Sequence, residues 1–261
     1  METQLQLILP SAVLPLLLSA LLFGFSRRHT IVLWGLPLIW FPSYVWITGW
    51  PSLLPGEAHE WLWLLAVFSV LIRIVTRYRL LSLSVLQTLL LTMVLIAAAW
   101  PVLKYQFDLM LVIELISLSA VGFALFCISG ADQARSPALS MAISSGGMAV
   151  VVALAGSLSI GQLAGALASV LAVFAVFEIF RMLQQPSVHN LDLIPVMQLY
   201  LVILAIARIF ADVPLGPVIL LLAAPLAGMI PGARYAAVFS AVAVIAAISW
   251  LLLTAEPSAY Y

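Results

Sequence analysis

Residues 137–181 decide the fold. They read PALSMAISSGGMAVVVALAGSLSIGQLAGALASVLAVFAVFEIFR in one-letter code. The stretch carries no charged residue before Glu178, and at about 45 residues it is twice as long as one helix needs to be to cross a bilayer. It therefore predicts two membrane-spanning helices that form a hairpin, with the reversal at Gly156-Ser157.

Small residues repeat at helical spacing on both arms of this predicted hairpin. On the first arm Ser140, Ser144 and Gly147 share one face, and on the second arm Gly161 and Gly165 do so. Faces of this kind let two helix backbones approach closely. We expect them to pack within the chain, and a homodimer formed through the same faces is the alternative.

The composition of the whole chain is that of an integral membrane protein. Of its 261 residues 65% are hydrophobic and only 8% are charged, against about 25% charged residues in soluble domains. Ten basic residues balance ten acidic ones without forming a run, so we expect no nucleic-acid partner. The sequence predicts an all-α, polytopic transmembrane helical bundle, a single domain over residues 1–261 with the lipid bilayer as its surroundings.

About ten spans are predicted, with nine or eleven as alternatives. Their limits follow from charged connections and from Pro and Gly residues. Prolines at positions 10, 15, 37 and 42 are expected to bend the first two spans, because proline removes a helix hydrogen bond. The spans cover residues 5–25, 31–50, 61–77, 80–100, 109–129, the two arms of 137–181, 193–211, 215–230 and 235–253.

Basic residues collect in every second connection, which predicts how the protein is oriented in the membrane. The remaining connections contain one basic residue, Lys104. Cytoplasmic loops carry an excess of Lys and Arg, so we expect both termini on the outer, non-cytoplasmic side. The basic connections contain Arg27, Arg28, Arg77, Arg79, Arg135, Arg181 and Arg234.

Four ionisable residues fall inside predicted spans, where a charge is costly and is a functional candidate. Their depth along the helices predicts one ion pair near the cytoplasmic ends, Arg73 with Glu178, and one near the outer ends, Glu114 with Arg208. Asp212 is expected one turn further out on the face of Arg208. Either these are structural pairs, or Glu114 is a protonatable coupling site and Arg208 contacts an anion.

The connection 49–63 is the best candidate for an extramembrane recognition surface. Glu57, His59 and Glu60 make it polar, prolines stiffen it, and tryptophans flank it at the level where indole rings favour the membrane interface. The alternative is an ordinary loop anchored by those tryptophans.

Several kinds of chemistry are not supported by the sequence. His29, His59 and His189 fall in predicted connections, so an intramembrane haem with two histidine ligands is not expected. Metal, P-loop and dinucleotide motifs do not occur, and neither does a nucleophile with a placed base. Cys127, the single cysteine, is expected to be a small core residue. We therefore expect no cofactor and no catalysis.

The chain resembles multi-pass membrane proteins of bacteria that have no assigned function. The resemblance implies a helical bundle in the bacterial inner (cytoplasmic) membrane, and it carries no activity, substrate or site residue. It rests on Gly49-Trp-Pro-Ser-Leu-Leu-Pro-Gly-Glu-Ala-His-Glu-Trp61, Gly156-Ser157, Gln162-Leu-Ala-Gly-Ala166, Asp212-Val-Pro214 and Ala224-Pro225-Leu226.

Two classes of function follow from the sequence. The first is a non-catalytic subunit or scaffold that packs with partner membrane proteins or with its own copies, as expected from the scarcity of polar groups at the bilayer midplane. The second is a secondary transporter or permease for a small molecule or ion, which would use proline-broken helices and Glu114. An enzyme acting on a lipid is a distant third.

Overall fold

The computed structural model describes residues 8–25, 35–53, 55–75, 80–105, 107–129, 137–181, 193–228 and 233–254, and all of its regular elements in these ranges are helices, which confirms the predicted all-α class. A π-helical turn, η1 (Leu9–Val13), and a 3-10 turn, η2 (Ala58–Glu60), accompany the α-helices. The α-helices are α2 (Leu14–Phe25), α4 (Leu36–Thr48), α5 (Trp61–Val75), α6 (Leu80–Tyr105), α7 (Leu109–Ser129), α8 (Pro137–Leu154), α9 (Leu158–Arg181), α10 (Ile194–Phe210), α11 (Leu215–Ala227) and α12 (Ala233–Thr254).

Within the described residues, five segments are long and apolar enough to cross a membrane. Five further apolar helices are shorter, and α10 is one of them. The two groups together indicate a membrane protein, while the count of ten spans and the side of the termini stay predictions. The five long segments are Ala58–Val75, Leu83–Tyr105, Leu109–Cys127, Leu158–Val176 and Arg234–Thr254.

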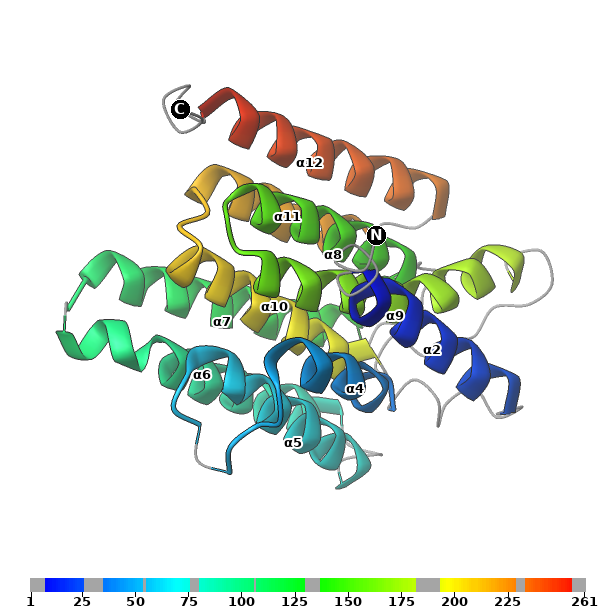
Figure 1. Cartoon of the computed structure of the whole chain (residues 1–261), viewed down its shortest axis with the longest axis horizontal. Coiled ribbons are helices and arrows are strands. Elements are labelled where there is room, and N and C mark those ends of the chain that lie inside the picture. The colour runs from blue at the N-terminus through cyan, green and yellow to red at the C-terminus, as the bar shows by residue number, and fades with distance from the viewer. Residues whose placement is uncertain are drawn as a thin grey trace.

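Helix α10 lies at the centre of the bundle. Each of its residues from Ile194 to Ala207 is buried, so this helix has no solvent- or lipid-facing stripe until its last turn. A helix that is apolar all round is stable only when other elements cover it on every side. Its neighbours are α4, α5, α6, α7, α8, α9 and α11, and Figure 1 shows it between the lower helices and the upper group of α8, α11 and α12.

Three tight turns join neighbouring helices at one end of the bundle, the left end in Figure 1: α6 to α7, α8 to α9, and α10 to α11. The second of these confirms the predicted reversal, since Gly156 adopts a φ of 97° between α8 and α9. Positive φ values are strained for residues that carry a Cβ atom, which explains a glycine here.

Two prolines have a local helix geometry that the sequence does not predict, while the bend expected at Pro10 stays a prediction. Helix α6 does not end at Trp100 but continues through Pro101 to Tyr105. Pro10 lies in the π-helical turn η1, where the wider winding accommodates a residue that has no amide hydrogen. The first span therefore begins with a π-helical turn and continues as the α-helix α2.

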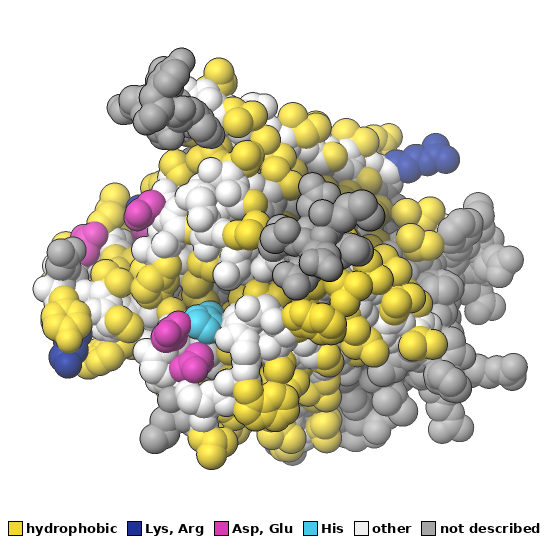
Figure 2. All heavy atoms as spheres, in the orientation of Figure 1, with side chains coloured by type: hydrophobic (Ala, Val, Ile, Leu, Met, Phe, Trp, Pro, Cys, Tyr) yellow, Lys and Arg dark blue, Asp and Glu magenta, His cyan; other side chains and the backbone are white. Residues whose placement is uncertain are grey.

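On the face drawn in Figure 2, hydrophobic side chains cover much of the described surface and charged groups are few. Helices α7 and α12 are the most open of the long segments, with 28% and 22% of their apolar windows buried. Cys127 is exposed on α7, which corrects the expectation of a core cysteine. These helices present rows of large apolar side chains that suit a hydrocarbon environment.

The two small-residue faces have different neighbours. Gly161 of α9 lies close to α8, where a Cβ atom would sit 3.0 Å from the Ala149 carbonyl oxygen. Gly165 has more room, because a Cβ atom there would meet only atoms of Ser11 and Ala149 at ordinary contact distances. The second arm thus packs within the chain on α8 and η1.

The face of Ser140, Ser144 and Gly147 is not the one that meets α9, which corrects the simple picture of a hairpin closed by two facing stripes. A Cβ atom on Gly147 would collide with Val244 of α12. Both serines are fully buried, and the Ser144 hydroxyl donates to the Met141 carbonyl oxygen of its own helix. Gly147 of this stripe therefore admits α12 rather than α9.

Substitution of Gly147 tests this packing, because its neighbour on α8 supplies a matched control. Gly147→Ala is expected to lower the thermal unfolding temperature in detergent, since Val244 is β-branched and cannot rotate its methyl groups away. Gly146→Ala is expected to have little effect, because the new methyl would find only the Ala168 Cβ atom, at 3.9 Å. Equal unfolding temperatures for the two variants would contradict the close approach of α8 and α12.

Candidate functional site

Glu114 of α7 and Arg208 of α10 form an ion pair, as the sequence predicts. The Arg208 Nε atom donates to Glu114 Oε2 and its Nη2 atom donates to Oε1, both at 3.1 Å. This two-pronged geometry matches the planar guanidinium to the carboxylate and is the strongest form of such a pair. The side chains are 18% exposed for Glu114 and 33% for Arg208, so the pair is only partly shielded.

The end of α10 holds the arginine in place. Helix α10 ends at Phe210, and the chain turns at Asp212, whose φ of 49° is in the left-handed region. This turn brings the Val213 carbonyl oxygen to Arg208, whose Nη1 atom donates to it at 3.4 Å. Asp212 therefore does not continue the helical face of Arg208, which corrects the sequence prediction; its exposed side chain lies beyond the helix end.

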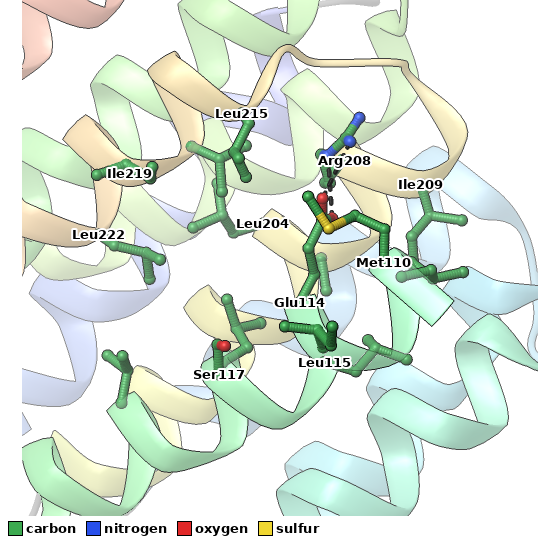
Figure 3. A pocket seen from close by; sticks show the side chains of 16 residues that line it. Met110, Glu114, Leu115, Ser117, Leu204, Arg208, Ile209, Leu215, Ile219 and Leu222 are labelled. Carbon is green, nitrogen blue, oxygen red and sulfur yellow. Dashed lines mark hydrogen bonds and ion pairs between the residues drawn. The ribbon is translucent and has the colours of Figure 1, made fainter. Parts of the chain in front are cut away.

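The ion pair lies at one end of a cavity of about 280 Å³ between α7, α10 and α11. Figure 3 shows Arg208 and Glu114 joined at that end and the apolar side chains of the three helices around the rest. Apart from the pair and Ser117, the lining is entirely apolar. The apolar lining includes Met110, Leu115, Val121, Leu204, Leu215 and Leu222.

The second predicted pair cannot be assessed in the same way. Arg73 is buried on α5, with 6% of its surface exposed. Glu178 belongs to α9, and its side chain lies outside the described residues. Helix α5 packs on α4, α6 and α10, whereas α9 packs on α2, α4, α8 and α10. The contact between Arg73 and Glu178 therefore stays a prediction.

A chain of buried amide hydrogen bonds is a feature that the sequence analysis missed. The Gln198 Nε2 atom of α10 donates to the Gln87 carbonyl oxygen of α6 at 2.5 Å, and Gln87 Nε2 donates to the Ser69 carbonyl oxygen of α5 at 2.9 Å. Both glutamines are fully buried. Uncharged polar residues inside apolar segments were the available signal, since such side chains hydrogen-bond across membrane helices.

The polar residues of the connection 49–63 are used largely for local structure. The Glu60 carboxylate accepts hydrogen bonds from the Gly56 and Glu57 amides at 2.6 and 3.2 Å, and from the Ser52 hydroxyl at 3.1 Å. Glu57 is open to solvent and lies 3.3 Å from His59 Nδ1. Figure 2 shows a histidine beside acidic side chains on this face. Glu60 thus caps η2 and shapes the loop, while Glu57 is the more accessible carboxylate.

The loop and the ion pair belong to two different places. Residues 55–57 and Trp61 border an open cleft of about 440 Å³ against α6, lined also by Met93 and Trp100. None of the residues that line this cleft lines the cavity beside Glu114. The sequence predicts that Glu114 and Arg208 lie near the outer ends of their spans, but the lining of the two cavities does not bring them together with the connection 49–63.

The lining of both cavities is mainly apolar, with few polar groups. Within the described part of the chain, His, Cys, Asp and Glu side chains do not gather in groups of three or more that could hold a metal ion. At the ion pair, a carboxylate and a guanidinium neutralise each other at the mouth of an apolar cavity. Such a site suits an amphiphilic ligand better than a polar one, because most of the lining offers no hydrogen bond.

A double-mutant cycle measures the ion pair. Glu114→Ala is expected to lower the unfolding free energy by about 2 kcal/mol, because the partly shielded guanidinium loses both charge-assisted hydrogen bonds. Arg208→Ala should cost a similar amount, and the double variant should cost clearly less than the sum of the two. Denaturant unfolding in a fixed detergent measures all three values.

Lys104→Gln is the control for this cycle, since Lys104 is an exposed charge in the last turn of α6. It should change the unfolding free energy little. The charge-swapped variant, Glu114→Arg with Arg208→Glu, should regain part of the loss. If the single losses simply added up in the double variant, the two side chains would not be coupled.

Asp212 provides a test of the turn that follows α10. Asp212→Asn should leave stability unchanged, because asparagine also tolerates the left-handed region and only the charge is lost. Asp212→Val should cost about 1 to 2 kcal/mol, since a β-branched residue is strained at that φ. Thermal unfolding of both variants decides the point: a loss in the asparagine variant as large as in the valine variant would mean that the charge matters instead.

No protein-family model matches the chain, and no curated protein and no solved structure does so either. A functional assignment therefore rests on the geometry of the chain itself.

Proposed function

We propose that the chain is a non-catalytic integral membrane protein of the bacterial inner membrane that acts as a subunit or scaffold by packing against partner membrane proteins. The observation that carries this proposal is the filled interior around α10. A polar substrate needs a hydrated route with polar partners near the middle of the membrane. Here the central helix is covered along its length by apolar neighbours instead.

The Gly- and Ser-rich part of α8 supports the same proposal. This is the place where a broken helix would have formed a transport site, yet Ser144 and Ser145 are fully buried. Val244 occupies the space beside Gly147. The residues that line the cavity at Glu114 do not include any residue of α8. Small residues that admit a neighbouring helix are the usual packing device of membrane bundles.

The outward faces of α6, α7 and α12 supply the surface for partners. They expose Met93 on α6, Ile116 on α7 and Val242 on α12, each by more than half of its surface. In each of the five long segments, at most 56% of the most apolar stretch is buried inside the protein. The remaining apolar area is available for other transmembrane helices.

Secondary transport with Glu114 as a protonatable group is the alternative, and the geometry favours it less. Both carboxylate oxygens of Glu114 are engaged by Arg208. Protonation would replace two charge-assisted hydrogen bonds by weaker ones. The pair also lies near helix ends, where a structural pair is less costly than at the midplane.

Site-specific photo-crosslinking tests the proposal. A photoreactive amino acid is placed at Met93, Ile116 or Val242, one position at a time, and the chain is produced at its native level in its own cells. We expect one of these faces to give a discrete adduct with the same membrane protein in every preparation. Mass spectrometry identifies the attached protein and its stoichiometry.

The control position is Leu163 of α9, which is buried and should crosslink only within the chain. The absence of a discrete protein adduct from all three exposed positions would contradict the subunit role. Proton flux into vesicles that contain the purified chain, abolished by Glu114→Gln and retained in Lys104→Gln, would establish the transport alternative instead.

A further inference from the structure

The cavity beside the ion pair has the length of one membrane leaflet. Its lining on α7 runs from Met110 to Val121, and the rise of 1.5 Å per residue makes this about 16 Å. The hydrocarbon core of a bilayer is about 30 Å thick, so one leaflet provides about 15 Å. Glu114 lies four residues from Met110 and seven from Val121, so the apolar part of the cavity beyond the ion pair is about 10 Å long on α7, which is enough to hold much of one acyl chain.

The volume of the cavity excludes a helix as its occupant. A helix segment of the same length, at least 10 Å across with its side chains, would occupy more than about 1,000 Å³. The cavity measures about 280 Å³, which suits one slender chain. Its open side is bordered by Ile113 and Ile219, both half exposed, so a chain can enter from the surroundings of the bundle.

An apolar groove in a membrane is not left empty, because an unfilled void loses the dispersion contacts of all the atoms that line it. The side walls offer Leu115, Leu118, Leu204 and Leu222, and Ser117 is the only uncharged polar residue of the lining. The walls thus match the chemistry of a saturated or monounsaturated hydrocarbon chain.

The charged end of the cavity matches a phosphate. A guanidinium has five N–H donors, and the described contacts of Arg208 use one hydrogen each on Nε, Nη1 and Nη2. Two donors are left on a side chain that is one-third exposed. Arginine with free donors in a fork binds phosphate oxygens well. Asp108 and Asp212, both exposed, lie at the ends of α7 and α10 on this side and suit an ammonium group.

We infer that this cavity binds one acyl chain of a zwitterionic phospholipid, with the headgroup phosphate on Arg208. Glu114 orients the guanidinium through its two hydrogen bonds, and the helices α7, α10 and α11 enclose the acyl chain. The inference goes beyond the subunit role, and its test uses the purified chain without any partner. A result that refutes the lipid site would leave the proposed subunit role standing, and a result that refutes the subunit role would leave the lipid site standing.

The experiment uses the full-length chain in vesicles of phosphatidylethanolamine that contain a small fraction of the same lipid with a mid-chain diazirine. After irradiation, mass spectrometry maps the modified residues. We expect adducts to concentrate on the residues that line the cavity, with Ser117, Leu118 and Leu222 among them. Ser117→Phe fills the cavity from an exposed position and should reduce these adducts severalfold.

Ile116→Phe is the matched control, because it places the same ring on the same helix outside the cavity lining. It should leave the adducts unchanged. A second comparison uses the unmodified chain with a diazirine diacylglycerol, which lacks the phosphate and should label the cavity severalfold less. This comparison remains decisive even if a variant fails to fold.

Three results would overturn the inference. The first is labelling of exposed residues on α6 and α12 as dense as that in the cavity, which would mean ordinary contact with bulk lipid. The second is a Ser117→Phe variant that folds and is labelled like the unmodified chain. The third is equal labelling by the phosphate-free lipid, which would remove the role of Arg208.

Discussion

Inside a hydrocarbon environment a polar group has no water to bond with, and this constraint shapes every polar contact of the bundle. Some serine hydroxyls donate to carbonyl oxygens of their own helix, as Ser119 does to Leu115. Others reach a neighbouring helix, as Ser240 of α12 does to Ala224 of α11, and so do long polar side chains such as Gln198. The polar groups therefore fix the neighbours and the register of the helices, while the apolar surface supplies most of the favourable free energy.

Two of the inter-helix polar links lie at different levels of the bundle. The amides of Gln198 and Gln87 connect α10, α6 and α5 deep in the interior, where an uncharged donor costs less to bury than a charge. The charged pair of Glu114 and Arg208 connects α7 to α10 near the helix ends, where part of each side chain is exposed. Each link fixes the position of one helix along its neighbour, which apolar packing alone would leave free to shift.

Much of the fold could be predicted because its signals are local. Apolar length and interruptions by Pro and Gly place the helices, and Gly156 marks the turn between α8 and α9. Glu114 and Arg208 could be paired because both lie near ends that alternating helices bring together. Which helix packs against which could not be predicted in the same way. The small-residue face at Gly147 is visible in the sequence, whereas its neighbour α12 depends on the tertiary arrangement.

The remaining misses have physical reasons too. A helix limit placed one residue too late put Asp212 on a helical face that it does not share, because a left-handed turn follows Phe210. Gln87 and Gln198 carry no charge, so the high cost of burying an ionised group does not single them out in the sequence, although both stand in apolar surroundings. The lipid-sized cavity depends on how three helices diverge, which no single segment encodes.

The full enclosure of α10 has a consequence for biosynthesis. Seven of the α-helices precede it in the chain in the described order from α2 to α9, and six of them become its neighbours. Until residues 194–210 leave the ribosome, those helices have no central element to pack on, and the Gln87 carbonyl oxygen lacks the amide of Gln198. Insertion and final packing are thus separated in time. The helices made first therefore pack incompletely, and their final packing follows the synthesis of α10.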